Sequence, residues 1–218
     1  MLRITHLIIA LTTALSLQAQ DSTRWDIGII TGLQRSYYDN QEGSSLGYVF
    51  TPKNELVNGF MVNYDINPYL LVEANILHSK KEFEFSSPSS TLEPVKTKHS
   101  YLGFPFLLKS GFGKKIKVSI ISGLTYEVAL GHSLETESGL SKGDLRDSEN
   151  YASVTEIQVV PRSNQLFVNA GLGLRLPIED YFHFYTSTRY SKSLTPVYSN
   201  GAGTYQHLIF LFGLTANI

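Results

Sequence analysis

Lys115–Gly131 reads KIKVSIISGLTYEVALG, and its side chains alternate in polarity from one residue to the next. Its even positions are Ile116, Val118, Ile120, Ser122, Leu124, Tyr126, Val128 and Leu130, all apolar except the serine. Its odd positions are Lys117, Ser119, Ile121, Gly123, Thr125, Glu127, Ala129 and Gly131, mostly small, polar or charged. A period of two predicts a β-strand with two unlike faces. Ordinary strands have about 3–10 residues, whereas a tilted strand needs about 9–11 to cross a bilayer, so this long run favours a membrane barrel.

Seven further segments alternate in the same way, which brings the predicted number of strands to eight. They are 25–38, 55–66, 69–83, 98–111, 164–177, 181–194 and 203–218. Four residues break the pattern because they place an apolar side chain on the polar face: Leu71, Leu77, Ile209 and Leu211.

The predicted connections alternate between short and long. The short ones are 67–68, 112–114 and 179–180, and the long ones are about 39–54, 84–97, 132–163 and 195–202. Short turns at one end and long loops at the other are typical of outer-membrane barrels. The sequence therefore predicts an all-β fold, a single eight-stranded antiparallel up-and-down transmembrane barrel.

The N-terminal 20 residues have the features of an export signal. Arg3 supplies a positive start, LIIALTTALSL an apolar run, and Gln18-Ala19-Gln20 a small and polar end. The apolar run is too short for a spanning helix, which needs about 20 residues. We predict a signal peptide at 1–20, cleaved after Ala19 or Gln20, and a barrel domain at 21–218 in the outer membrane.

Bulk composition excludes several classes of protein. The mean hydropathy of -0.06 excludes a bundle of membrane helices but suits barrel strands, which are only half apolar. A formal net charge of -1 gives no support for a nucleic-acid partner. The chain has no cysteine, which excludes disulfides, thiol catalysis and a lipoprotein anchor. We expect no cofactor.

Alternation alone does not decide which face points inward. A lipocalin-type barrel is apolar inside, and a membrane barrel is apolar outside. Large apolar residues occupy one face of every strand and many glycines the other, which favours a narrow membrane barrel filled by its own side chains. The alternative is a soluble barrel with charges exposed on its surface.

Charges on the polar faces predict an interior network. Near the short-turn end, three acids (Asp26, Asp65, Glu73) should be level with three bases (Lys109, Lys117, Arg175). We predict a second, higher layer that pairs Glu127 with Arg189. Balance is expected because an unpaired buried charge costs several kcal/mol.

Two parts of the sequence resemble a known family. YLGFPFLLK at 101–109, followed by a tight turn and ISGLTY at 121–126, resembles the PorT-like outer-membrane barrel family of Bacteroidetes. GLGL at 171–174 and RYS at 189–191 are similar to its later strands. The resemblance covers essentially the whole mature chain. It implies the outer-membrane bilayer and the barrel-assembly machinery as partners, and a role in protein secretion.

A proline lies in the middle of the predicted strand 98–111. Pro105 removes a hydrogen-bond donor from the strand ladder, so we expect a β-bulge there.

Candidate catalytic and metal-binding residues give weak signals. Ser122 is a hydroxyl on an apolar face, but His132 is ten residues away, roughly 33 Å at the usual strand rise and far beyond hydrogen-bond reach. His78, His99 and His132 fall near the loop ends of neighbouring strands, without the short spacing or carboxylates of a metal site. We therefore expect no enzyme and no metal.

The long connection at 132–163 has two interpretations, a solvated loop or a docking surface for an envelope or secretion protein. We expect a non-enzymatic outer-membrane barrel with a side-chain-filled interior and long extracellular loops, which assists protein secretion or envelope interactions. A small-solute pore and a lipid-modifying enzyme are the alternatives.

Overall fold

A computed structural model describes residues 25–39, 49–86, 95–113, 116–136, 163–179, 181–196 and 203–217. The predicted signal peptide and residues 137–162 of the predicted docking loop lie outside these ranges. Among the residues that the structure describes, no helix is long and apolar enough to cross a membrane.

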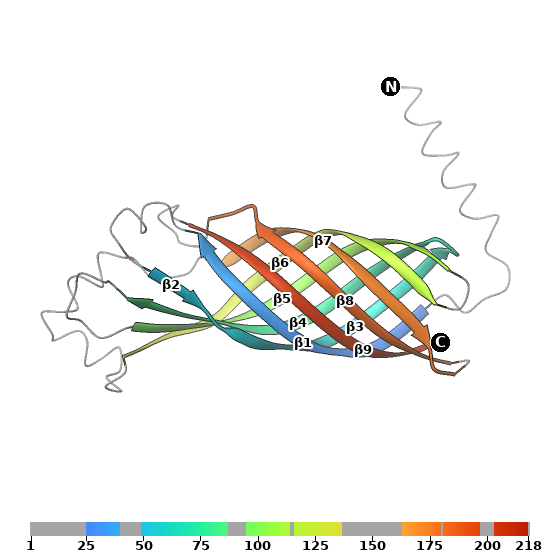
Figure 1. The fold of residues 1–218 in the computed structure, drawn as a ribbon, viewed down its shortest axis with the longest axis horizontal. Helices are drawn as coiled ribbons and strands as arrows, with labels where there is room; N and C mark the ends of the chain where they lie inside the picture. Colours follow the sequence, from blue (N-terminus) through green and yellow to red (C-terminus); the bar gives the residue numbers. More distant parts are fainter. Residues whose placement is uncertain are drawn as a thin grey trace, which may run out of the picture.

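The chain forms a closed antiparallel barrel of eight staves, as predicted (Figure 1). The strands are β1 (Trp25–Asp39), β2 (Val49–Pro52), β3 (Asn54–Asn67), β4 (Leu70–Ser86), β5 (Val95–Phe112), β6 (Lys117–Thr136), β7 (Asn164–Pro177), β8 (Phe182–Ser193) and β9 (Thr204–Asn217). The short β2 lies in the predicted connection 39–54 and was missed. It pairs with β4 as β3 does, so β2 and β3 together make one stave.

The wall runs β4-β3-β1-β9-β8-β7-β6-β5 and closes where β5 pairs with β4. When the register partners are followed once around the wall from Ile27, the path returns to β1 at Tyr37, ten residues further along. Such a stagger requires tilted strands, and eight strands enclose an interior just wide enough for side chains.

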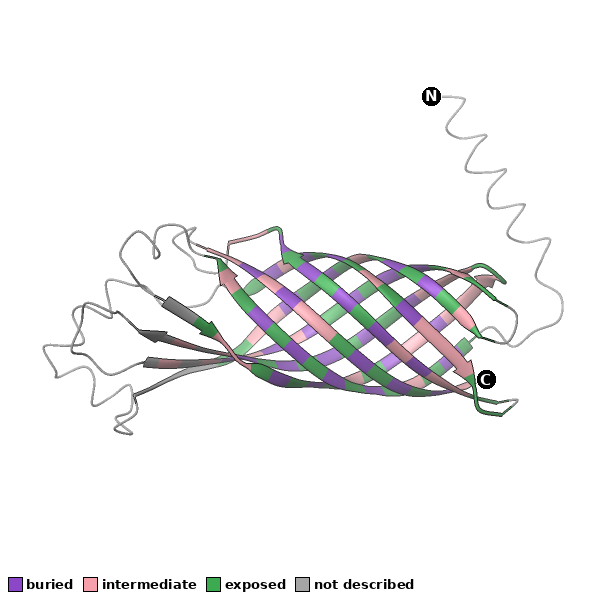
Figure 2. Cartoon of the chain, in the orientation of Figure 1, coloured by how far each residue is buried: buried purple, intermediate pink, exposed green. Residues whose placement is uncertain are grey.

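Side chains alternate across the wall along every stave (Figure 2). In β6, Ile120 is 59% exposed and its neighbour Ile121 is 1% exposed, although the two residues are chemically identical. The exposed large side chains form an apolar belt around the barrel, and most buried polar residues point inward. The predicted faces are therefore confirmed.

The staves β4, β5 and β6 are longer than predicted. β4 reaches Ser86, β5 starts at Val95, and β6 continues to Thr136. With β2 they project as a sheet beyond the end of β8, at the left of Figure 1. The connections that join these projecting strands are shorter than the sequence suggested, because strand pairing continues past the barrel wall, whereas the connection between β8 and β9 is slightly longer than predicted.

The bulge expected at Pro105 is absent. Pairing between β4 and β5 is interrupted beside Pro105, but the register is the same on both sides of the gap. Because proline has no backbone N–H, the strand pair loses a hydrogen bond at this position, but no extra residue is inserted into the strand. The register shift of the β5–β6 pair lies instead at Ser100/Tyr101, where β6 holds one extra residue, Leu130.

Candidate functional site

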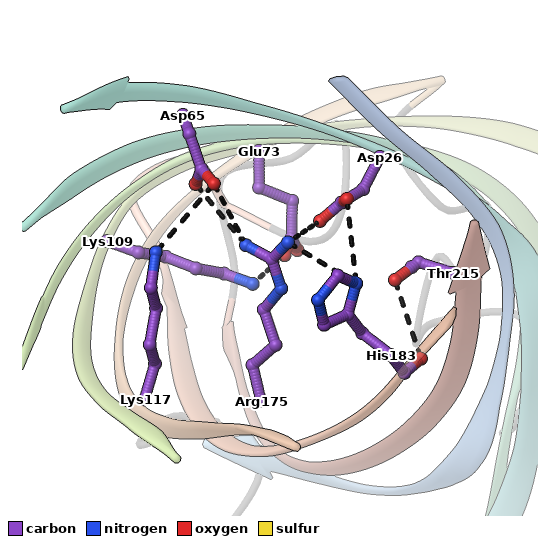
Figure 3. A network of polar contacts seen from close by, with 8 residues as sticks. All are labelled: Asp26, Asp65, Glu73, Lys109, Lys117, Arg175, His183 and Thr215. Carbon is purple, nitrogen blue, oxygen red and sulfur yellow. Dashed lines mark hydrogen bonds and ion pairs between the residues drawn. The ribbon is translucent and has the colours of Figure 1, made fainter. Parts of the chain in front are cut away.

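The short-turn mouth of the barrel holds a network of ionisable side chains from five strands (Figure 3). Arg175 lies between two acids, with Nη2 2.6 Å from Asp26 Oδ2 and Nη1 3.1 Å from Asp65 Oδ2. Lys117 Nζ lies 3.8 Å from the same Asp65 oxygen. His183 Nδ1 lies 3.8 Å from Asp26 Oδ1. The mouth is partly open to solvent, since the side chain of Asp65 is 26% exposed.

A second cluster lies deeper and centres on Glu73, which is fully buried. Glu73 Oε1 accepts from Arg189 Nη2 at 2.5 Å and from Asn75 Nδ2 at 2.6 Å, and Glu73 Oε2 pairs with Lys109 Nζ. Tyr185 completes the cluster, with its hydroxyl 3.3 Å from Arg189 Nη2 and its ring centroid 3.7 Å from Lys109 Nζ. One acid therefore compensates two bases.

An apolar layer crosses the middle of the interior. It consists of Ile30, Val57, Met61, Leu77 and Leu211, all buried, and Tyr185 packs against it. Leu77 and Leu211 are two of the residues that break the sequence alternation. Their inward position explains the break, because this part of the barrel is filled with hydrophobic rather than polar groups.

Toward the other end, a single lysine is enclosed by aromatic rings. Lys81 is 0% exposed, and its ammonium pairs with the carboxylate of Glu127. Lys81 Nζ lies 4.1 Å from the ring centroid of Tyr101, 4.6 Å from that of Tyr205 and 4.8 Å from that of Phe167. Cation–π attraction and one ion pair thus replace the hydration that this cation has lost.

The structure brings Asp26, Asp65, Lys117 and Arg175 together in one layer, and it places Glu73 with Lys109 in the deeper one. The predicted pairing of Glu127 with Arg189 is wrong. The long side chain of Arg189 reaches Glu73, and Glu127 pairs with Lys81.

Sequence reasoning missed Lys81. A signal was present, because Lys81 shares the inward parity of Glu73, Asn75 and Ser79 along β4.

Side chains of the described residues fill much of the interior. A cavity behind the short-turn mouth and another in the middle have volumes of about 30 and 20 Å³, room for one or two waters each. A Cβ atom placed on Gly173 would lie 2.8 Å from Ser119 Oγ and 3.1 Å from Ile121 Cδ1. A larger residue here would make the side chains of Ser119 and Ile121 shift, so glycine suits the close packing of this layer.

The other candidates from the sequence are scattered. Ser122 is exposed on the outer wall, His78 also points outward, and His99 is buried inside. The side chain of His132 lies outside the described residues. Within the described ranges, no group of three or more potential ligand side chains could hold a metal ion.

Comparison with known proteins decides the family. A model of the outer membrane protein beta-barrel domain matches residues 18–199. The chain belongs to this family. It is an outer-membrane β-barrel, and its apolar belt faces the lipid. No functionally curated protein matches it in sequence.

Several solved outer-membrane barrels are similar in structure to this chain. OprG from Pseudomonas aeruginosa is 12% identical, with 90% of this chain and 97% of that chain covered and a TM-score of 0.52. Ail from Yersinia pestis is 12% identical, with 88% and 98% covered and a TM-score of 0.46. The protease OmpT from Escherichia coli is 10% identical, with 89% and 97% covered and a TM-score of 0.44. The similarity to OprG supports the fold of this outer-membrane barrel and assigns no activity.

Proposed function

We propose that this outer-membrane barrel works through the surface it displays at its outer end, and that it assists protein secretion or other contacts within the envelope. The filled interior is the observation that carries the proposal. Between the Lys81 cage and the Asp26–Arg175 mouth, the described side chains leave cavities of only about 30 and 20 Å³. A solute would have to displace buried ion pairs to pass, which favours a display function over a small-solute pore.

The projecting sheet gives the outer end a rigid platform. β2, β4, β5 and β6 continue beyond the barrel wall, and Lys53 ties β2 to β4 through Glu82 at 3.3 Å and Glu84 at 3.4 Å. The short turns of outer-membrane barrels face the periplasm, so this sheet faces outward. Paired strands hold their positions better than loops, which suits a docking surface.

The resemblance to the PorT-like family supports secretion as the process. In this proposal the projecting sheet and the connection at 137–162 bind an envelope or secretion protein. The barrel anchors that surface in the bilayer, and its interior has no role in transport or catalysis.

Two measurements test the proposal. In planar bilayers, the refolded protein should produce no discrete conductance steps, and reproducible steps would contradict a closed interior. In whole cells, a photocrosslinking residue at the exposed Thr51 of β2 should give one defined adduct. The same residue at the exposed Tyr181, at the short-turn end, should not give that adduct. An identical adduct pattern at both positions, or none at Thr51, would remove the docking role.

A further inference from the structure

A serine and a histidine are hydrogen-bonded on the lipid-facing wall. Ser100 Oγ on β5 lies 2.9 Å from His78 Nε2 on the neighbouring β4. When the proton of the imidazole is on Nδ1, the serine hydroxyl donates to Nε2. In this arrangement a histidine can accept the hydroxyl proton as the serine attacks a substrate.

The pair lies at the level of lipid ester groups. Along β5, the outward side chains are apolar from Phe112 to Leu102, apart from Ser110, and become charged at Lys98. Along β4, they are apolar up to Ile76, and Lys80 follows His78. Ser100 and His78 therefore sit where the apolar belt ends on the outer side. In a lipid leaflet, this is the boundary between acyl chains and head groups, where the ester bonds lie.

The strand that pairs with β5 on the other side is irregular beside Ser100 and leaves room for a substrate. The register shift of the β5–β6 pair falls at Ser100/Tyr101, where β6 holds one extra residue, Leu130, and bulges are frequent next to active sites. The register partner of Ser100 on β6 is Gly131, and a Cβ atom placed there would meet no atom within 4 Å. The space in front of the hydroxyl is thus open on this side.

A cation lies beside the serine. Lys80 is the register partner of Ser100 on β4, and it is exposed on the same outward face. Its flexible stem allows the ammonium to approach an oxygen that becomes negative during attack on an ester carbonyl.

An apolar groove adjoins the histidine. It has a volume of about 660 Å³, and its lining includes His78, Leu102, Ile76, Phe60 and Asn58. Its walls are mostly apolar, so it suits an acyl chain. Asn58 is the register partner of His78, and its Oδ1 accepts from Thr31 Oγ1 at 2.7 Å. A held amide therefore stands beside His78 on the neighbouring strand.

We propose that Ser100 and His78 form a site that hydrolyses acyl esters of outer-leaflet lipids. Ser100 Oγ bonds to the ester carbonyl carbon while His78 Nε2 takes the hydroxyl proton. The bond from that carbon to the alcohol oxygen then breaks, and the leaving oxygen receives the proton. Water attacks the acyl-serine, passes a proton through His78 to Ser100 Oγ, and releases the fatty acid.

This activity goes beyond the proposed function and replaces the expectation that the barrel is not an enzyme. It uses the outer wall of β4 and β5, whereas the docking role uses the projecting sheet. The two can fail separately, because neither conductance nor crosslinking at Thr51 depends on the Ser100 hydroxyl.

The test is labelling by a fluorophosphonate, a probe that reacts with activated serines, combined with fatty-acid release. Folded wild-type protein in detergent should carry the probe on Ser100, identified by peptide mass. It should also release fatty acid from phosphatidylethanolamine vesicles or from vesicles that contain lipid A. Ser100→Ala should abolish both signals, and His78→Ala should lower the labelling rate by about 10²- to 10⁴-fold.

Ser122→Ala is the matched control, because it removes an exposed serine of the belt for which the described residues provide no hydrogen-bond partner. It should label like wild type. Heat-dependent migration on gels verifies that each variant is folded.

Three results would overturn the proposal. Folded wild type that carries no probe, or a Ser100→Ala variant that labels equally, would remove the catalytic serine. Labelling of Ser100 without fatty-acid release from either lipid would remove lipid esters as the substrate class. Release from only one of the two vesicle types identifies the lipid.

Discussion

The two ends of the barrel interior compensate their charges differently. Toward the short-turn end, one charged group pairs with several partners of opposite charge, as Glu73 does with both Lys109 and Arg189. Toward the other end, Lys81 pairs with one carboxylate and lies against three aromatic rings. The lower network opens to solvent at its mouth, whereas Lys81 has no exposed surface. A narrow barrel can therefore be closed by ion pairs at one end and by a caged cation at the other.

The difference has energetic consequences. Removal of one partner from a buried pair typically costs 3–5 kcal/mol, because it leaves an uncompensated charge. Removal of one partner from a half-exposed pair costs little, because water replaces it. Substitutions along the barrel axis should therefore follow burial rather than the number of ion pairs.

The largest effect is expected for Glu73→Ala. It leaves both Lys109 and Arg189 buried without their shared acid, so we expect a loss of about 5 kcal/mol in the free energy of unfolding. The heat-modified gel transition of the folded barrel should move to lower temperature. Glu179→Ala, which removes an exposed acid at a turn, is the control and should leave the transition unchanged. An unchanged transition in Glu73→Ala would refute the deep cluster.

A smaller loss is expected for Lys81→Met. The methionine fills the aromatic cage but leaves Glu127 unpaired, and we expect about 3 kcal/mol, measured by denaturant unfolding in lipid. The double variant Lys81→Met/Glu127→Gln should recover most of this loss, because neither member of the pair is then charged. Lys80→Met, on the opposite face of β4, should have no comparable effect. If the double variant is no better than the single one, the ion pair is not what holds Lys81.

The smallest effect is expected for Lys117→Ala. Its ammonium lies 3.8 Å from Asp65, both side chains are more than a quarter exposed, and Asp65 keeps Arg175 as a partner. We expect a loss of at most about 1 kcal/mol in the same unfolding assay. A loss as large as that of Glu73→Ala would mean that water is excluded from the mouth as fully as from the deeper cluster around Glu73.

Much of the fold follows from two-residue periodicity. The strand at 164–177 matches β7 residue for residue, and the bounds of most others differ by only a few residues. Inward parity also places Asp65 and Arg175 correctly, because a side-chain period of two leaves no other choice once the apolar face meets lipid.

The remaining features depend on register and side-chain reach, which periodicity does not contain. The ion pair between Arg189 and Glu73 could not be predicted from periodicity, because the long side chain of Arg189 reaches a partner at a different height along the barrel axis. Ser100 and His78 face each other only through the β4–β5 alignment, so the alternation along single strands points to Ser122 instead. The aromatic cage combines rings from β5, β7 and β9, which are far apart in the sequence.

Spin labels along β6 test the inside-out polarity most directly, and the chain has no native cysteine to interfere with their attachment. In lipid vesicles, labels at the outward positions Ile120 and Leu124 should collide with oxygen and remain shielded from a water-soluble nickel reagent. Labels at the inward positions Ile121 and Thr125 should be shielded from both. If the inward set collides with oxygen, or the outward set with nickel, the apolar face does not meet lipid and the account is wrong.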